Sequence, residues 1–204
     1  MRLITVRGGE HWAEYNDSQQ GRAARPLCAE LITLDGDGAG RDAIDLGCGA
    51  GIETRALLSA GWRVYATDAA PGTRERVLAA TDETDPARLT VEVTDLRTLR
   101  DLPHADLIYA GYSLPYVGPN HLPAVWRVIR ARLRPGAWLG VNLFGENDSW
   151  AGNPDEVFLG ASAARALFDG LDVLRFDEVE EDGPAYSGTK HWHTFDVIAR
   201  MPTM

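Results

Sequence analysis

The chain has 204 residues, of which 45% are hydrophobic and 25% charged, a balance typical of one folded globular domain. Its formal net charge of −10 argues against a nucleic-acid partner, because such binders normally present a basic field to phosphates. The sequence contains no apolar run long enough to cross a bilayer. The apolar part of residues 1–7 is too short, and charge follows it too early, for a secretory signal. Two cysteines without a spaced framework predict a reducing compartment, so we expect a cytoplasmic protein without a membrane partner.

Strand and helix signals alternate from about residue 40 onward, which favours an α/β fold with a mostly parallel, doubly wound sheet. In chain order, the expected elements are a helix over 22–34, a strand over 43–46, a helix ending at Leu58, a strand over 62–67, a helix from Pro71 to about Ala80, strands over 89–94 and 107–110, a helix over 122–133, a strand over 138–144, a helix near 161–168, and late β segments over 171–179 and 191–199. The stretch 182–184, Asp-Gly-Pro, predicts a direct turn between the late segments and therefore an antiparallel hairpin at the sheet edge.

The strongest motif is the stretch 45–51, Asp-Leu-Gly-Cys-Gly-Ala-Gly, which lies between an expected strand and an expected helix. Glycines let the backbone turn sharply and approach a ligand, and the helix that follows offers unpaired N–H groups. In an open α/β sheet, ligands bind in this crevice at the carboxyl ends of the strands. Asp68 ends the next strand, at about the interval where an acid holds ribose hydroxyls. The two features together predict an adenosine-containing ligand.

The spacing of the glycines decides between two such ligands. A dinucleotide fingerprint would place its third glycine at position 52, but that residue is Ile52, and Gly51 comes one place early. Asp45 would also point negative charge toward a pyrophosphate, whereas a cationic sulfonium ligand gains from a nearby acid. The sequence therefore favours S-adenosylmethionine over NAD. A nicotinamide oxidoreductase remains the alternative, since Tyr186 and Lys190 have the Tyr-x-x-x-Lys spacing, although in the last β region and not on a helix.

The pattern Asp-x-Gly-x-Gly-x-Gly followed by an acid after the second strand resembles class I S-adenosylmethionine-dependent methyltransferases. The resemblance implies a seven-stranded Rossmann-like sheet with an antiparallel C-terminal edge hairpin. It also implies one methyltransferase domain over 1–204, with an N-terminal helical cap or lid over 1–40 and the core over 41–204. The cofactor-binding residues that it implies are Asp45, Gly47, Cys48, Gly49 and Gly51 for the methionine and ribose portion, Asp68 with Ala69 for the ribose, Asp95 and Leu96 for adenine, and Ala110, Gly111 and Tyr112 along the methionine moiety.

Several local features are similar to small bacterial methyltransferases of the tellurite-resistance type, a group whose members need not share a substrate. These features are the compact length, Trp12-x-x-Tyr15, the stretch 144–150 and the stretch 190–193. Trp12 and Tyr15 are interpreted as part of a lid over the cofactor, and the alternative is a helix that only packs on the sheet.

The acceptor side is predicted from the last strands, which the resemblance brings near the acceptor pocket. His191 and His193 are the candidate general bases, and they share one face of a strand while Trp192 takes the other. The alternative is a surface strand with two half-solvated histidines. The expected substrate-binding residues are the aromatic side chains Tyr116, Phe144 and Trp150, although core packing is the simpler interpretation of Phe144.

The function expected from these features is S-adenosylmethionine-dependent methyl transfer to a small-molecule acceptor with an oxygen, nitrogen, sulfur or chalcogen nucleophile. A protein that binds the cofactor without transferring its methyl group is the third alternative. The sequence has no cluster of His, Cys and Asp with metal-ligand spacing, so we expect no metal.

Overall fold

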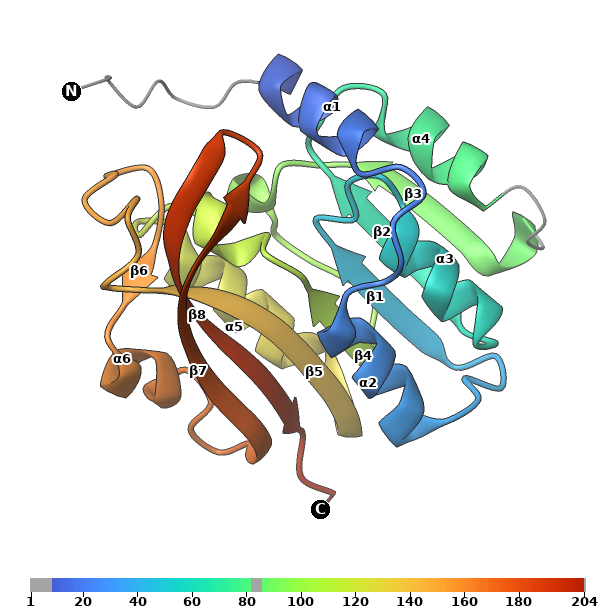
Figure 1. Ribbon diagram of the computed structural model, residues 1–204. Helices are drawn as coiled ribbons and strands as arrows, with labels where there is room; N and C mark the ends of the chain where they lie inside the picture. The colour runs from blue at the N-terminus through green and yellow to red at the C-terminus, as the bar shows by residue number, and fades with distance from the viewer. Residues whose placement is uncertain (1–8, 82–85, 204) are drawn as a thin grey trace.

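The computed structural model describes residues 9–81 and 86–203. Its centre is a mixed eight-stranded sheet (Figure 1). The strands are β1 (Asp42–Leu46), β2 (Arg63–Asp68), β3 (Leu89–Val93), β4 (Ala105–Ala110), β5 (Leu133–Gly145), β6 (Phe158–Leu159), β7 (Asp172–Ala185) and β8 (Gly188–Arg200). The helices are α1 (Gly9–Ser18), α2 (Pro26–Asp35), α3 (Ile52–Ser59), α4 (Thr73–Ala80), α5 (Leu122–Arg132) and α6 (Ala161–Ala166), with 3-10 turns η1 (Pro86–Arg88), η2 (Leu96–Thr98) and η3 (Leu114–Val117). The predicted fold class is confirmed.

The strand order β3-β2-β1-β4-β5-β8-β7 places a crossover between β1 and β4. From β1 the chain first builds outward through β2 and β3, and it then returns to lay β4 on the other side of β1. All of these neighbours are parallel, so their carboxyl ends meet at one edge of the sheet. In such folds the ligand crevice lies where the strand order reverses. The topology therefore positions a site at the ends of β1 and β4.

The C-terminal hairpin is antiparallel, as expected, but its turn is not where the sequence suggested. β8 pairs with β5 on one side and β7 on the other, so β7 forms the sheet edge. The prediction of a turn at 182–184 was wrong, because Asp182 pairs with His191 and Pro184 with Thr189. An edge strand tolerates proline, since one of its sides needs no ladder hydrogen bond. The hairpin therefore extends to a tip at 186–187, and its added length reaches α1.

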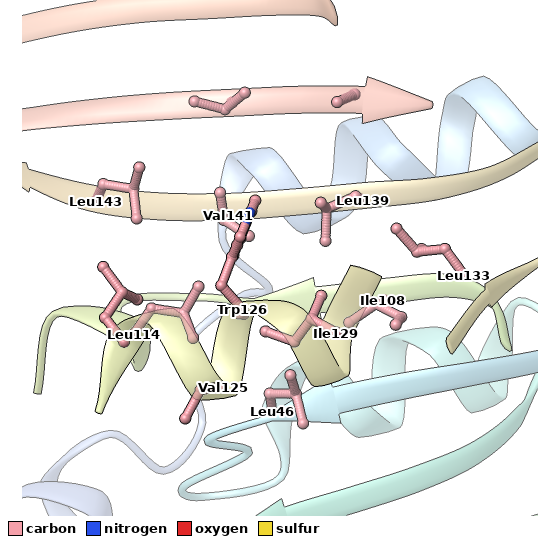
Figure 2. Close-up of a cluster of buried hydrophobic side chains, with 14 of the residues drawn as sticks. Leu46, Ile108, Leu114, Val125, Trp126, Ile129, Leu133, Leu139, Val141 and Leu143 are labelled. Carbon is pink, nitrogen blue, oxygen red and sulfur yellow. The ribbon is translucent and has the colours of Figure 1, made fainter. Parts of the chain in front are cut away.

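Hydrophobic residues cover both faces of the sheet. On one face, Trp126 and Ile129 of α5 pack against Ile108, Leu139 and Val141, as Figure 2 shows. The opposite face of the same strands packs against α2, α3 and α4; its buried residues include Leu31, Leu57, Trp62, Val77, Leu107 and Ile198. Alternation along β4 sends Leu107 to one cluster and Ile108 to the other. The core therefore holds the strand ends of the central crevice in fixed positions.

Helix boundaries differ from the expected ones near the N-terminus. The helix expected over 22–34 begins at Pro26, because proline fits the first turn of a helix and disfavours helical backbone in the residue before it. The short strand β6 was not predicted. The predicted absence of a secretory signal was drawn from residues 1–7, which lie outside the described residues. The division into a cap over 1–40 and a core over 41–204 stays a prediction. Within the described residues, every helix is too short or too polar to cross a bilayer.

Candidate functional site

A cavity of about 1130 Å³ lies at the carboxyl ends of the central strands. One end, which we call the loop end, is formed by the glycine loop after β1 and by the residues that follow β2 and β3. The other end, the hairpin end, is formed by the segment after β4, by 150–156 and by one face of β7 and β8. Residues of α1 line both parts of the wall. Figure 1 shows α1 and the tip of the β7–β8 hairpin at this edge of the sheet.

The glycine loop is held tightly between two neighbours. Gly47 has a φ of +77° and Gly49 a φ of +51°, which glycine adopts without a steric penalty. A Cβ on Gly47 would lie 2.3 Å from the Cβ of Ser113, and one on Gly49 would lie 2.8 Å from the Oδ1 of Asn16. The Ser113 hydroxyl also donates to the carbonyl of Leu46 at 2.6 Å. The loop conformation is therefore fixed both by its own glycines and by α1.

Asp68 at the end of β2 is held by backbone amides. Its Oδ2 accepts from the N–H of Gly49 at 3.0 Å, and its Oδ1 accepts from the N–H of Ala70 at 2.7 Å. Each carboxylate oxygen can accept a further hydrogen bond, because it has two lone-pair sites. The acid is thus oriented beside the glycine loop with acceptor capacity remaining for ligand hydroxyls.

Asp45 is buried beneath the loop, where it accepts a hydrogen bond from Thr54 Oγ1 at 2.6 Å. Burial, followed by the charge of Glu53, raises the pKa of Asp45 to about 7, against the effect of the Thr54 hydrogen bond. Glu53 itself accepts two hydrogen bonds from the Arg22 guanidinium, at 2.6 and 2.8 Å. A positively charged ligand would favour the ionised form of Asp45, because it would offset the repulsion between neighbouring carboxylates. The loop end is therefore suited to a cation and not to a pyrophosphate.

The end of β3 adds a third carboxylate to the loop end. The Asp95 side chain accepts from the backbone N–H of Arg97 and forms an ion pair with its guanidinium at 2.6 Å. These Arg97 contacts lower the pKa of Asp95, so this carboxylate stays ionised. Leu96 also lines the cavity here, next to the backbone turn that Asp95 caps. Leu96 and Asp95 thus give this end of the cavity one apolar and one acidic surface.

Alternate residues of β8 form the floor of the hairpin end. Trp192, Thr194 and Asp196 share one face of the strand, and all three line the cavity. The Tyr112 ring lies beside this face, 6.2 Å from the Trp192 ring, measured between centroids. Tyr112 has a φ of +54°, an uncommon conformation for a residue with a side chain, and such strain is concentrated at functional sites.

Aromatic residues from α1 and the hairpin tip line the cavity. The Trp12 ring lies 4.6 Å from the Tyr116 ring, and the Tyr15 ring lies 5.7 Å from that of Tyr186 at the hairpin tip. The Tyr15 hydroxyl accepts a hydrogen bond from Arg25 at 3.1 Å. Trp12 and Tyr15 therefore line the cavity next to the hairpin tip, and their role as a lid stays a prediction.

Most of the predicted cofactor residues converge on this cavity. Those that line it are Trp12, Tyr15, Asp45, Gly47, Cys48, Gly49, Asp68, Ala69, Asp95, Leu96, Gly111 and Tyr112. Gly51 instead forms the start of α3 and packs against Val77, and Ala110 is fully buried in β4. Burial raises the pKa of the Cys48 thiol well above its usual range, so Cys48 is a packing residue and not a nucleophile.

The predicted histidines lie on the other face of β8 from the cavity. His193 is buried, with its Nε2 3.0 Å from Glu178 and its Nδ1 accepting from the backbone of Asn147. His191 lies between Asp182 and Glu180, whose hydrogen bonds raise its pKa. Neither histidine is among the residues that line the cavity. The sequence identified two faces of this strand correctly but did not show which one meets the site.

The expected acceptor-side aromatics are partly displaced as well. Tyr116 and Trp150 line the cavity, whereas Phe144 is 1% exposed and lies behind the wall. Lys190 does not resemble the lysine of an oxidoreductase dyad, because its Nζ binds the Asp148 carboxylate at 2.6 and 2.8 Å. Among the described residues, no group of three or more His, Cys, Asp or Glu side chains is arranged to hold a metal ion.

Three polar residues of the hairpin end are absent from the predicted site residues. Arg25, Thr194 and Asp196 all line the cavity. Two of them follow Trp192 at intervals of two along β8, so the strand period was a signal that could have indicated them. Arg25 lies just before α2, and its place in the sequence did not distinguish a contact with an anionic acceptor from a solvated arginine.

Fold and site together define a class of protein. Residues 44–139 match a family model described as a methyltransferase domain. This match spans 96 of the 204 residues, and its description agrees with the resemblance to class I S-adenosylmethionine-dependent methyltransferases, whose cofactor is S-adenosylmethionine. The glycine loop and Asp68 both line the cavity, and their part in holding that cofactor stays a prediction.

Named relatives agree with this class. Over 125 residues the chain is 30% identical to the trans-aconitate 2-methyltransferase of Mycobacterium tuberculosis, a match that covers 61% of this chain and 45% of that protein. The chain thus spans less than half of the curated relatives it matches. The structure of TehB from Haemophilus influenzae has a TM-score of 0.76 at 12% identity, covering 93% of this chain and 67% of TehB. The N-methyltransferase NodS from Bradyrhizobium japonicum, bound to S-adenosyl-L-homocysteine, gives 0.69 at 16%, covering 94% and 98%.

Proposed function

We propose that this chain transfers the methyl group of S-adenosylmethionine to a small-molecule acceptor. The observation that carries the proposal is Asp68, whose two oxygens are oriented by backbone amides beside the glycine loop and at the wall of a large cavity. That arrangement suits a ribose diol. The chemistry of the surrounding acids suits a cation, because Asp45, Glu53 and Asp95 all line the same end.

The residues present fit this cofactor along its whole length. Asp68 would accept from the ribose hydroxyls, and Leu96 with Asp95 would face the adenine. The glycine loop and Asp45 would hold the cationic methionine portion. When bound, the cofactor supplies a methyl carbon activated by a positively charged sulfur. The chain then needs mainly to orient the acceptor and to exclude water.

A small acceptor is supported by the size of the cavity. Trp12, Tyr15 and Tyr186 line it, and a volume of about 1130 Å³ must hold both donor and acceptor. The negative charge of the chain adds to this argument, because it disfavours a nucleic-acid acceptor.

Calorimetric titration with S-adenosylmethionine, S-adenosylhomocysteine and NAD tests the proposal. We expect the first two ligands to bind and NAD to show no heat of binding. Transfer of a labelled methyl group to small molecules then distinguishes an enzyme from a protein that only binds the cofactor. Binding of NAD with hydride transfer, and without affinity for S-adenosylmethionine, would replace the proposal with an oxidoreductase.

A further inference from the structure

We infer that the acceptor is an amine and that Asp196 takes a proton from its nitrogen. This inference rests on the proposed function, since it concerns what occupies the hairpin end of the same cavity. It is carried by two features of that end, an aromatic wall and a group of carboxylates, and by a buried hydroxyl without a partner toward the loop end of the same cavity.

The aromatic wall is built around Phe144. The rings of Tyr112, Tyr116, Trp150 and Trp192 lie at centroid distances of 6.2, 5.5, 6.2 and 6.1 Å from its ring, respectively. These four side chains line the cavity, and Phe144 supports them from behind. Faces of aromatic rings attract alkylammonium groups within about 6 Å. The hairpin end therefore presents a surface that favours a cationic, partly apolar guest.

The wall already carries protein cations on its rings. The Arg25 guanidinium lies over the Tyr112 ring at 4.9 Å. The Lys190 Nζ lies 3.8 Å from the Trp192 ring centroid, on a side chain that does not line the cavity and is paired with Asp148. The Lys190 charge is thus balanced from behind the wall, and it does not oppose a cation in front of it.

Among the described residues, carboxylates outnumber cationic groups at the hairpin end. Asp155, Glu181 and Asp196 line it, against Arg25 and against Arg97, whose charge interacts with Asp155. An amine acceptor would compensate this negative charge, whereas a carboxylate acceptor would add to it. Arg25 is the group that an anionic acceptor would use, so the experiments below compare the two directly.

Asp196 is positioned as a base by its neighbours in the sheet. On β5, Asn142 Nδ2 donates to Asp196 Oδ1 at 2.6 Å, and on β7, Asp177 is its cross-strand partner. Burial raises the pKa of Asp196, and Asp177 adds to this effect; the Asn142 hydrogen bond and the charges of Arg175 and Arg25 oppose it. A carboxylate with a raised pKa accepts protons more readily near neutral pH.

A further acceptor of N–H groups lies toward the loop end of the cavity, where the charged neighbours of Tyr109 include Glu53 and Asp45. The Tyr109 hydroxyl is buried and has no hydrogen-bond partner in the structure, and Tyr109 lines the cavity. A buried hydroxyl without a partner costs free energy that a ligand would recover. An ammonium has several N–H donors, so one of them can use this hydroxyl.

The proton and electron balance of the step is simple. An acceptor that arrives as R–NH₃⁺ gives one proton to the Asp196 carboxylate and becomes R–NH₂. The nitrogen lone pair then forms a bond to the methyl carbon, and the carbon–sulfur bond breaks with its electron pair on sulfur. The product is R–NH₂–CH₃⁺ and a neutral thioether, and Asp196 returns its proton to water.

Matched probes test the chemical class of the acceptor. Phenethylamine, hydrocinnamate and phenethyl alcohol share a ring and differ in the terminal group. Titrated into the protein loaded with S-adenosylhomocysteine, phenethylamine should bind at least about tenfold more tightly than the other two. Tighter binding of hydrocinnamate, or equal or absent binding of all three, would overturn the amine assignment.

The chemical class of the methylated product can be measured without knowing the substrate. Labelled methyl groups transferred to the small-molecule fraction of a bacterial extract should be stable to alkali and retained on a cation exchanger. Volatile label released by alkali would indicate a methyl ester and overturn the inference, as would label absent from the cationic fraction. If S-adenosylhomocysteine itself does not bind, the proposed function fails instead, and the two failures are therefore distinguishable.

Variants on opposite faces of β7 and β8 separate chemistry from folding. Asp196→Asn should lower kcat with the cationic fraction about 10²- to 10⁴-fold and remove the acidic limb of the pH profile, with affinity for S-adenosylhomocysteine unchanged. Asp196→Glu should recover part of the rate. Glu181→Gln should raise KM for the amine, whereas Glu180→Gln, on the face away from the cavity, should leave it unchanged. Full activity and an unchanged pH profile in Asp196→Asn would contradict the role of this base.

Discussion

The two ends of the cavity are built in different ways. The loop end is formed by residues that follow directly after parallel strands, and backbone groups hold its most specific side chain, Asp68. The hairpin end is formed by side chains from α1, the segment after β4 and the long β7–β8 hairpin. Because the loop end is built from residues directly after parallel strands, it can bind different ligands that contain a nucleoside. The hairpin end depends on distant contacts, and it is where acceptor specificity can vary.

The largest expected loss of stability comes from breaking the buried ion pair between Lys190 and Asp148, which lies beside the hairpin end. Both side chains are almost fully buried, and the pair lies behind Trp150 and Trp192. Lys190→Met leaves Asp148 as an uncompensated buried charge, so the free energy of unfolding should fall by about 3–5 kcal/mol. Urea denaturation measures this loss.

A matched pair of controls tests the cause of that loss. Arg132→Met removes the partner of the exposed Asp101, and it should leave the free energy of unfolding nearly unchanged. The double variant Lys190→Met with Asp148→Leu should recover much of the stability. At temperatures where Lys190→Met remains folded, S-adenosylhomocysteine should still bind; loss of that binding would show that the two ends are not separable.

The second effect concerns the loop end alone. Asp68→Ala removes a charge-assisted acceptor, so it should weaken S-adenosylmethionine binding by about 1.5–3 kcal/mol, which is about tenfold or more. Calorimetry measures the change, and Asp101→Ala, at an exposed ion pair remote from the cavity lining, serves as the control. Unchanged affinity in Asp68→Ala would mean that the ribose lies elsewhere.

Two glycine substitutions separate the cost of a strained backbone from the cost of a steric overlap. Gly47→Ala adds a Cβ at 2.3 Å from Ser113 and requires a positive φ, and we expect a loss of about 2–4 kcal/mol in unfolding free energy. Gly36→Ala requires a similar φ of +71° but has no atom within 4 Å of the new Cβ. It should cost only about 1–2 kcal/mol. Equal losses would show that Ser113 can move without cost.

The smallest expected effect is a dependence of binding on pH. Since the pKa of Asp45 in the ligand-free fold is about 7, well above its usual value, the fold favours the protonated acid. The contribution of this group to stability is therefore present at low pH and is lost as the pH rises toward and through 7. A cationic ligand favours the ionised acid, so affinity for S-adenosylmethionine should rise as the pH increases from about 5.5 to 7.5.

Calorimetry in buffers with different ionisation enthalpies should detect the accompanying proton release. The rise in affinity should be less than about tenfold per pH unit, because one proton is involved. Asp45→Asn should flatten the profile. A profile that is equally steep in Asp45→Asn would assign the proton to another group.

The loop end could be predicted from the sequence because its chemistry is local. Gly47, Gly49 and Asp68 are informative as residue types at fixed distances from predicted strands, and the structure places them together. The parallel strands and their helices were predicted for the same reason, since apolar periodicity and glycine signals lie within short windows.

The hairpin end could not be predicted in the same way, because which residues meet there depends on register. The period of β8 separated the histidines from Trp192, but only the packing of β8 between β5 and β7 shows that Trp192, Thr194 and Asp196 face the cavity. The Asp-Gly-Pro stretch at 182–184 has strong turn chemistry, yet an edge strand accommodates it. Arg25 reaches the site from another element, and the sequence did not distinguish it from a solvated arginine.

We propose that one cavity holds a nucleoside donor at the loop end with its sulfur directed toward the hairpin end. A crystal structure with S-adenosylhomocysteine should show ribose hydroxyls on the Asp68 carboxylate and the sulfur facing Tyr112 and Asp196. A nucleoside bound elsewhere, or a sulfur directed away from the β8 face, would contradict it.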